Sequence, residues 1–187
     1  MALFTTHADR KGINRMIVPP KRGAFCVAAL AAATLLGGCT AVNVRLAMNE
    51  GVAHFKGKRF DAAAASFQKA ITLDPNHSEA FLDLGLTYME MYEPGSEVEK
   101  DLQYAQGAID AFKQYIRITP DHEKVEGYLI NVCKLSHRMA DAIEFYLEFF
   151  EKNPQDIDLI KKIANLYHLS GDTENSVKFY EKVAQME

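Results

Sequence analysis

One aromatic position recurs along most of this chain at nearly constant intervals. Phe67, Phe112, Tyr146 and Tyr180 are separated by 45, 34 and 34 residues. A small residue stands four positions before each of them: Ala63, Ala108, Ala142 and Ser176. A spacing of four places both members of a pair on one face of a helix, and a period of this length is typical of stacked two-helix units. The pattern therefore predicts an array of helical hairpins.

Each unit also carries signals for close helix packing and for its own end. Pro75, Pro120 and Pro154 follow the first three aromatics by eight residues, where each would end a helix. Gly51 and Gly85 lie in the preceding helices, where a missing side chain lets two helices approach closely. One hairpin cannot bury its apolar face alone, so the units must stack. We predict an all-α solenoid of about four repeats and eight helices, with repeats at 44–77, 78–122, 123–156 and 157–187.

The first unit identifies the kind of repeat. Residues 50–77, EGVAHFKGKRFDAAAASFQKAITLDPNH, resemble the tetratricopeptide repeat (TPR), a helix–turn–helix unit of about 34 residues, and the resemblance extends over 44–187. The family implies an α-solenoid whose first helices line a concave groove for an extended peptide or a partner helix. The second unit departs from this pattern by eleven extra residues, with a turn at Pro94-Gly95. We expect a longer hairpin there, with Tyr88, Met91 and Tyr92 packed on Val98, Leu102 and Ala105.

The resemblance assigns candidate partner-binding residues to the first helices. In the first two units the expected groove positions are apolar: Met48, Val52, Phe55, Leu82, Leu86 and Met89. In the later units they are polar: Asn131, Lys161 and Asn165, which match residues of the family's clamp for a peptide C-terminal carboxylate. That clamp also uses basic residues on repeats that would follow Glu187. Alternatively, the polar candidates form only a generic polar wall of the groove. Some of the apolar candidates could equally be ordinary core residues.

A separate signal lies near the start of the chain. Lys21 and Arg22 precede the uncharged stretch Ala24–Leu36, and Leu36-Gly37-Gly38-Cys39 closes it. The arrangement resembles the signal peptide and lipobox of bacterial lipoproteins. It implies that residues 1–38 are a signal peptide and that Cys39 carries lipid. The apolar stretch is 13 residues long, shorter than the ~20 of a spanning helix; an uncleaved anchor or a buried helix is the alternative. Met16 is a second possible start.

The implied lipid sets an expected location. Residues 39–43 would form a short lipidated linker before the TPR domain at 44–187, and acyl chains such as palmitate would attach the protein to a membrane. By family rules Thr40, which is not aspartate, indicates the outer membrane, facing the periplasm. Without residues 1–38 the chain holds 16 basic and 24 acidic residues, a net charge of −8. Such a charge disfavours nucleic acid as a partner.

Motifs for chemistry are missing from the sequence. It has no G-x-S-x-G, no phosphate-binding glycine loop, no H-E-x-x-H and no paired cysteines. No two histidines after Cys39 have metal-ligand spacing. We predict no catalytic, cofactor or metal site and no enzyme activity. Cys133 is the one cysteine after Cys39; it is either a reactive thiol or a small buried apolar residue, and its place in the repeat favours the second.

The resemblance implies a function in binding. We expect a lipid-anchored envelope adaptor or scaffold that binds another envelope protein in its groove, as do lipoproteins that assist secretins and pili (pilotin-like) or regulate cell-wall enzymes. The alternative is a self-associating structural spacer or coat. That alternative rests on the absence of a polar capping helix before Glu187, a feature that missing further repeats or a tolerated bare end would also explain.

Overall fold

The computed structural model describes the backbone of residues 24–186 and the side chains of residues 40–186. Met16, Lys21 and Arg22, on which the predicted signal peptide depends, lie outside the described residues. Met1–Gly38 and Cys39–Glu187 are separate compact units. The described part contains eight helices and no strand, which confirms the all-α solenoid. The helices are α1 (Ala24–Lys56), α2 (Phe60–Leu73), α3 (Ser78–Met91), α4 (Glu99–Ile118), α5 (Glu123–Leu135), α6 (Met139–Lys152), α7 (Ile157–Ser170) and α8 (Thr173–Ala184).

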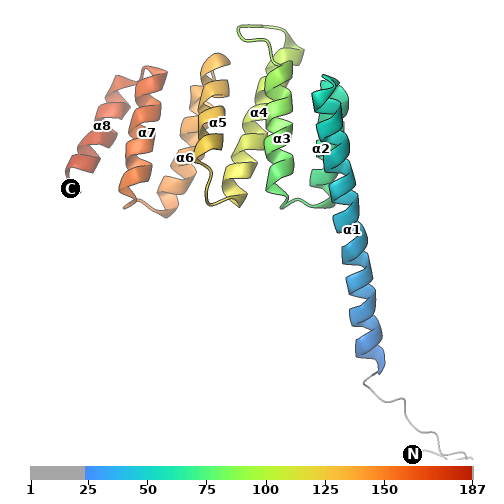
Figure 1. Ribbon diagram of the computed structural model, residues 1–187. Helices are drawn as coiled ribbons and strands as arrows, with labels where there is room; N and C mark the ends of the chain where they lie inside the picture. The colour runs from blue at the N-terminus through green and yellow to red at the C-terminus, as the bar shows by residue number, and fades with distance from the viewer. Residues whose placement is uncertain (1–23, 187) are drawn as a thin grey trace, which may run out of the picture. The chain divides into compact units, whose positions relative to one another are not determined.

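The helices of Cys39–Glu187 form two layers. In Figure 1, α3, α5 and α7 lie in front of their hairpin partners, so the first helices of successive hairpins form one layer and the second helices form the other. From α2 to α8 the extensively contacting helix pairs are all consecutive in the sequence. Pro75, Pro120 and Pro154 each lie in a connection between a second helix and the next first helix. This is the arrangement that the proline spacing predicted.

Two glycines allow close contact between the helices of a hairpin. An ideal Cβ on Gly51 would lie 2.4 Å from Cε1 of Phe67, and one on Gly85 would lie 2.5 Å from Cε1 of Phe112. Neither distance leaves room for a carbon atom without movement of the aromatic ring. The predicted role of these two glycines is therefore confirmed, since the recurring aromatic fills the space that each one leaves.

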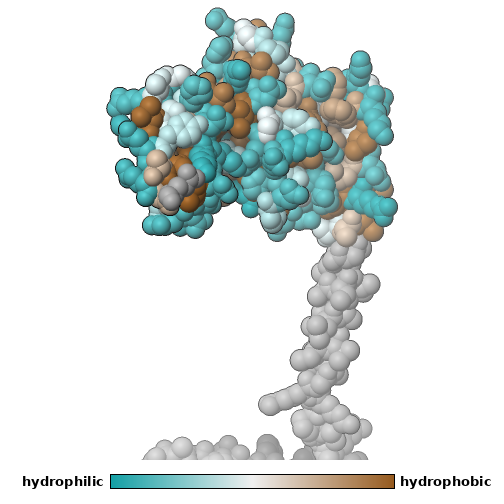
Figure 2. Space-filling view, turned by 60° about the vertical axis from the view of Figure 1, so that its left-hand side comes forward, coloured by the Kyte–Doolittle hydropathy of each residue, from teal (hydrophilic) through white to brown (hydrophobic). Residues whose placement is uncertain are grey.

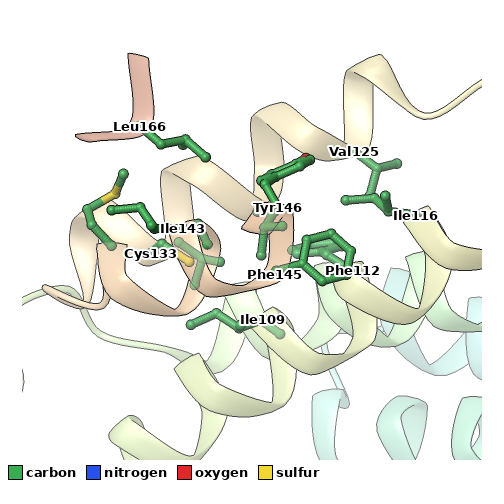
Figure 3. Close-up of a cluster of buried hydrophobic side chains, with 14 of the residues drawn as sticks. Ile109, Phe112, Ile116, Val125, Cys133, Ile143, Phe145, Tyr146 and Leu166 are labelled. Carbon is green, nitrogen blue, oxygen red and sulfur yellow. The ribbon is translucent and has the colours of Figure 1, made fainter. Parts of the chain in front are cut away.

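The small residue and the aromatic of each repeat form the core. Ala63, Ala108 and Ala142 are fully buried, and Ser176 is nearly so. The larger of two core clusters joins the second, third and fourth repeats, and Figure 3 shows its side chains converging from neighbouring helices. Tyr180 differs, because it is 47% exposed. It lies on α8, and no further described helix follows to cover it.

The insertion in the second repeat lengthens α4 to 20 residues. The Tyr88 and Tyr104 rings stack with centroids 6.1 Å apart, and the buried Tyr92 donates its hydroxyl hydrogen to the Leu135 carbonyl at 3.1 Å. The expected packing of Val98 is wrong, since this residue is 60% exposed and precedes the first residue of α4. The connection turns at Gly95, whose φ of 82° lies in the left-handed region.

Residues 40–43 are helical and continuous with the rest of α1. The sequence led us to expect a short linker, which at about 3.4 Å per extended residue could place the array up to about 15 Å from Cys39. In helical form the same four residues span about 6 Å. They include Ala41, a strong helix former, and no proline or glycine. The first repeat therefore begins almost directly after Cys39.

Candidate protein-binding groove

The six apolar groove candidates lie on α1 and α3. All of them are half-buried and pack against the core clusters with part of their surface; they are Met48, Val52, Phe55, Leu82, Leu86 and Met89. Each side chain therefore contributes to packing and also leaves some apolar surface open. On the face shown in Figure 2, apolar patches interrupt a largely hydrophilic surface.

Two hollows give this apolar surface its shape. The first, of about 130 Å³, lies between α1 and α3, and its lining includes Val52 and Phe55. The second, of about 220 Å³, lies between α3 and α5, and its lining combines apolar and aromatic residues such as Leu82 and Tyr128 with Asp121, His122 and Lys124. Leu86 lines both hollows, so they meet at this residue. Apolar hollows in a row can receive successive apolar side chains of one bound segment.

The carboxylate of Asp83 lines the first hollow. Asp83 on α3 is half-buried there. Burial raises the pKa of Asp83, the negative charge of Glu79 raises it further, and His77 opposes both. A cationic group on a bound partner would relieve this partly desolvated charge. The hollow is thus mostly apolar, with Asp83 and Lys56 as its charged side chains.

The three polar candidates are exposed on the first-helix layer. Asn131 lies on α5, and Lys161 and Asn165 lie on α7, four residues apart and so on one face of that helix. The groove positions therefore change in character along the array, from apolar side chains on α1 and α3 to polar ones on α5 and α7. Sequence reasoning missed Tyr115 and Tyr128, which line the second hollow. Tyr115 lies on α4, which is a second helix, whereas the groove candidates were taken from the first helices alone.

The described residues hold few features that point to chemistry. Among these residues, no group of three or more His, Cys, Asp or Glu side chains lies close enough together to hold a metal ion. Within the same residues, no helix has the length and apolar character needed to cross a membrane.

Cys133 is buried in the larger core cluster. Burial raises the pKa of its thiol to about 12, and the charge of Asp141 contributes to the rise. The structure thus supports the interpretation of Cys133 as a small apolar core residue, because the nucleophilic thiolate is scarce at neutral pH.

We expect Cys133 to resist alkylation. In a Cys26→Ser, Cys39→Ser chain it is the only cysteine, so mass spectrometry after iodoacetamide treatment at pH 8 reports on it alone. The folded protein should stay unmodified, whereas the same protein in urea should be fully alkylated. Rapid modification of the folded form would contradict the burial of this thiol.

The described helices form stacked antiparallel pairs, and the first helices of the pairs form one layer. This arrangement is that of helical-repeat solenoids. Residues 51–91 match the family model described as TPR repeat, and residues 162–187 match the one described as Tetratricopeptide repeat. The chain therefore contains TPR repeats, and its fold is a TPR-type α-solenoid. Solenoids of this type are scaffolds for protein–protein interaction and are typically not enzymes.

Known proteins resemble the chain at low sequence identity. Tetratricopeptide repeat protein 21A of Mus musculus is 23% identical over 135 residues, which are 70% of this chain but only 9% of that protein's length. A crystal structure of MamA aligns with a TM-score of 0.46 and 22% identity, covering 77% of this chain and 78% of that one. A MamA structure from Desulfovibrio magneticus RS-1 aligns with a TM-score of 0.45 and 15% identity, covering 76% and 75%.

Proposed function

We propose that this protein is a lipid-anchored adaptor of the bacterial cell envelope, which holds a segment of another envelope protein in the groove of its first helices. The observation that carries the binding role is the pair of hollows that share Leu86, the first mostly apolar and the second of mixed apolar and polar lining. The lipobox Leu36-Gly37-Gly38-Cys39 supports the anchor, and Thr40 supports the outer membrane, on its periplasmic side. Assistance to a secretin or pilus and regulation of a cell-wall enzyme are both compatible with this role.

Site-specific photocrosslinking in intact cells tests the groove. A photoreactive amino acid at Asn131 should give a discrete adduct with one envelope protein, whereas the same group at Glu144, which is exposed on the second-helix layer, should not. Adding Leu86→Glu should reduce the Asn131 adduct about tenfold, because a charge in an apolar hollow opposes binding. Equal adducts at Asn131 and Glu144, or an adduct that Leu86→Glu leaves unchanged, would refute the groove.

A second experiment tests the lipid anchor independently of the groove. The Cys39→Ser chain should leave the membrane fraction in flotation, because the acyl chains provide the attachment. Metabolic labelling with a radioactive fatty acid should mark the wild type and not this variant. A labelled variant, or an unlabelled wild type, would remove the anchor without affecting the groove.

Self-association is the second candidate function. It rests on exposed apolar side chains at two distant helices: Val177 and Tyr180 on α8, 48% and 47% exposed, and Val42 and Leu46 on α1, 58% and 53% exposed. Exposed apolar surface of this kind can mark an interaction site. Sedimentation velocity of the Cys39→Ser chain should show oligomers that grow with concentration if these surfaces join copies. A single monomeric species over the whole range would exclude this function.

A further inference from the structure

A carboxylate is buried where the third and fourth repeats meet. Glu126 on α5 is only 8% exposed. Glu126 lies four residues before the repeat position that Gly51 and Gly85 occupy in the first two repeats. The same position in the other repeats holds Ala47, Phe81 and Ile160. An apolar side chain is thus the usual choice here, and a carboxylate is unfavourable inside a protein unless it is paired.

Two nitrogen atoms, one from His122 and one from Lys162, contact the same oxygen of this carboxylate. Nε2 of His122 lies 3.1 Å from Oε1 of Glu126, and Nζ of Lys162, on α7, contacts Oε1 as well. Nδ1 of His122 lies 2.7 Å from the Thr119 carbonyl oxygen. Lys162 balances the charge of Glu126, and the contacts of His122 and Lys162 are to Oε1 rather than to the second oxygen, Oε2.

The second unusual polar group is the hydroxyl of Tyr146. This residue is the counterpart of Phe67 and Phe112, so a phenyl ring alone fills the position in the first two repeats. Tyr146 is 3% exposed, and its hydroxyl is buried without a hydrogen-bond partner. Burial and the nearby charge of Glu126 raise the pKa of Tyr146, so the phenol stays protonated and can donate. In Figure 3 its oxygen is directed toward the part of the cluster that contains Val125 of α5.

Glu126 and Tyr146 line the same cavity. It has a volume of about 170 Å³, and His122, Lys162 and Asn153 also contribute to its wall. Since one water molecule takes up about 30 Å³ of liquid, the cavity has room for a small polar group. Apolar residues at both positions would serve packing better. A bound ligand therefore explains why two polar groups converge here.

We propose that this cavity binds the side-chain carboxamide of a glutamine or asparagine on a partner polypeptide. A carboxamide presents a carbonyl oxygen and an N–H₂ group side by side. The oxygen accepts from the Tyr146 hydroxyl, and the N–H₂ donates to Oε2 of Glu126. A carboxylate ligand lacks the N–H₂ donor and would add a second negative charge beside Glu126, whose own charge is already paired with Lys162. The cavity adjoins the second hollow at His122, but the two groups that would bind the carboxamide, Glu126 and Tyr146, do not line that hollow, so the proposal can be tested apart from the groove.

An NMR titration of the full chain tests this assignment with three small probes: N-acetyl-glutamine methylamide, its glutamate counterpart and free glutamine. The blocked glutamine should shift the resonances of His122 and Tyr146, and the glutamate probe should bind at least about tenfold more weakly, since it loses a hydrogen bond and adds a repulsion. Free glutamine should bind no more tightly than the blocked form. Equal binding of the glutamate probe, tighter binding of free glutamine, or a cavity that holds water only would each overturn the proposal.

Tyr146→Phe separates binding from folding. It removes one unpaired hydroxyl and keeps the ring, so the unfolding midpoint should be unchanged or higher. Affinity for the blocked glutamine should nevertheless fall about five- to tenfold, the loss of one hydrogen bond. Tyr128→Phe, which alters a tyrosine of the groove instead, should bind this probe as the wild type does. Wild-type affinity in Tyr146→Phe would overturn the proposal.

Discussion

Phe112→Ala should destabilise the array strongly, and more than truncation of the exposed aromatic at the same repeat position. Phe112 is fully buried, and its ring fills the space left by Gly85. Removal of a buried phenyl ring costs about 3–5 kcal/mol, because the transfer free energy of the ring is lost and a cavity remains. Urea denaturation followed by circular dichroism at 222 nm measures this loss.

Tyr180→Ala is the matched control for Phe112→Ala. Tyr180 occupies the same repeat position but is 47% exposed, so its truncation should cost less than about 1.5 kcal/mol. The comparison tests whether burial, rather than repeat position, determines how much the aromatic residue contributes to the free energy of unfolding. Equal losses in the two variants would contradict this interpretation.

Gly85→Val should have the second largest effect. A Cβ at this position meets the Phe112 ring at 2.5 Å, and the ring is held in a packed core. Overpacking of this kind costs about 1–3 kcal/mol, and the higher helix propensity of valine offsets only part of it. The same denaturation experiment should show a clearly lower midpoint.

Gly127→Ala provides the control for a glycine in a helix. Gly127 lies on α5, is exposed, and a Cβ there meets nothing within 4 Å. Alanine should therefore stabilise the protein by about 0.5–1 kcal/mol through helix propensity alone. If Gly127→Ala and Gly85→Val shifted the midpoint in the same direction, close helix contact at Gly85 would not be the cause.

Repeat periodicity predicted the helical hairpins well, because small residues, glycines and aromatics must recur wherever two helices touch. It could not predict burial at each copy. Phe112 and Tyr180 share one position in the pattern, yet only Phe112 is covered on all sides. Periodicity defines which face of a helix is apolar, whereas coverage depends on the neighbour that packs there.

The residues at which helices begin were harder to predict than the presence of the helices. Asn76-His77-Ser78-Glu79 and Ser96-Glu97-Val98-Glu99 have the spacing of capping boxes, which predicts helices that start at Asn76 and Ser96. The residues before α3 and α4 are instead His77 and Val98, and neither makes a side-chain cap. The side-chain caps that do form belong to Asp156 and Asp172, at α7 and α8. Ser, Asn and Asp side chains have several backbone groups within reach, so sequence alone does not decide which one they bond.

The buried cluster around Glu126 could not be predicted from the sequence. A lone acidic residue on a helix normally indicates a solvated face. Its partner Lys162 lies 36 residues away, on the first helix of the next repeat. Only stacking brings the two side chains together. A carboxylate at a position that is apolar in the other repeats was the one signal available.

Contact between consecutive helices also has a consequence for biogenesis. A chain leaving the ribosome emerges N-terminus first, and each hairpin of this array finds its packing partner in the segment that has just emerged or is about to follow. Low contact order of this kind favours rapid folding. No early segment has to wait, with its apolar surface uncovered, for a late one to arrive.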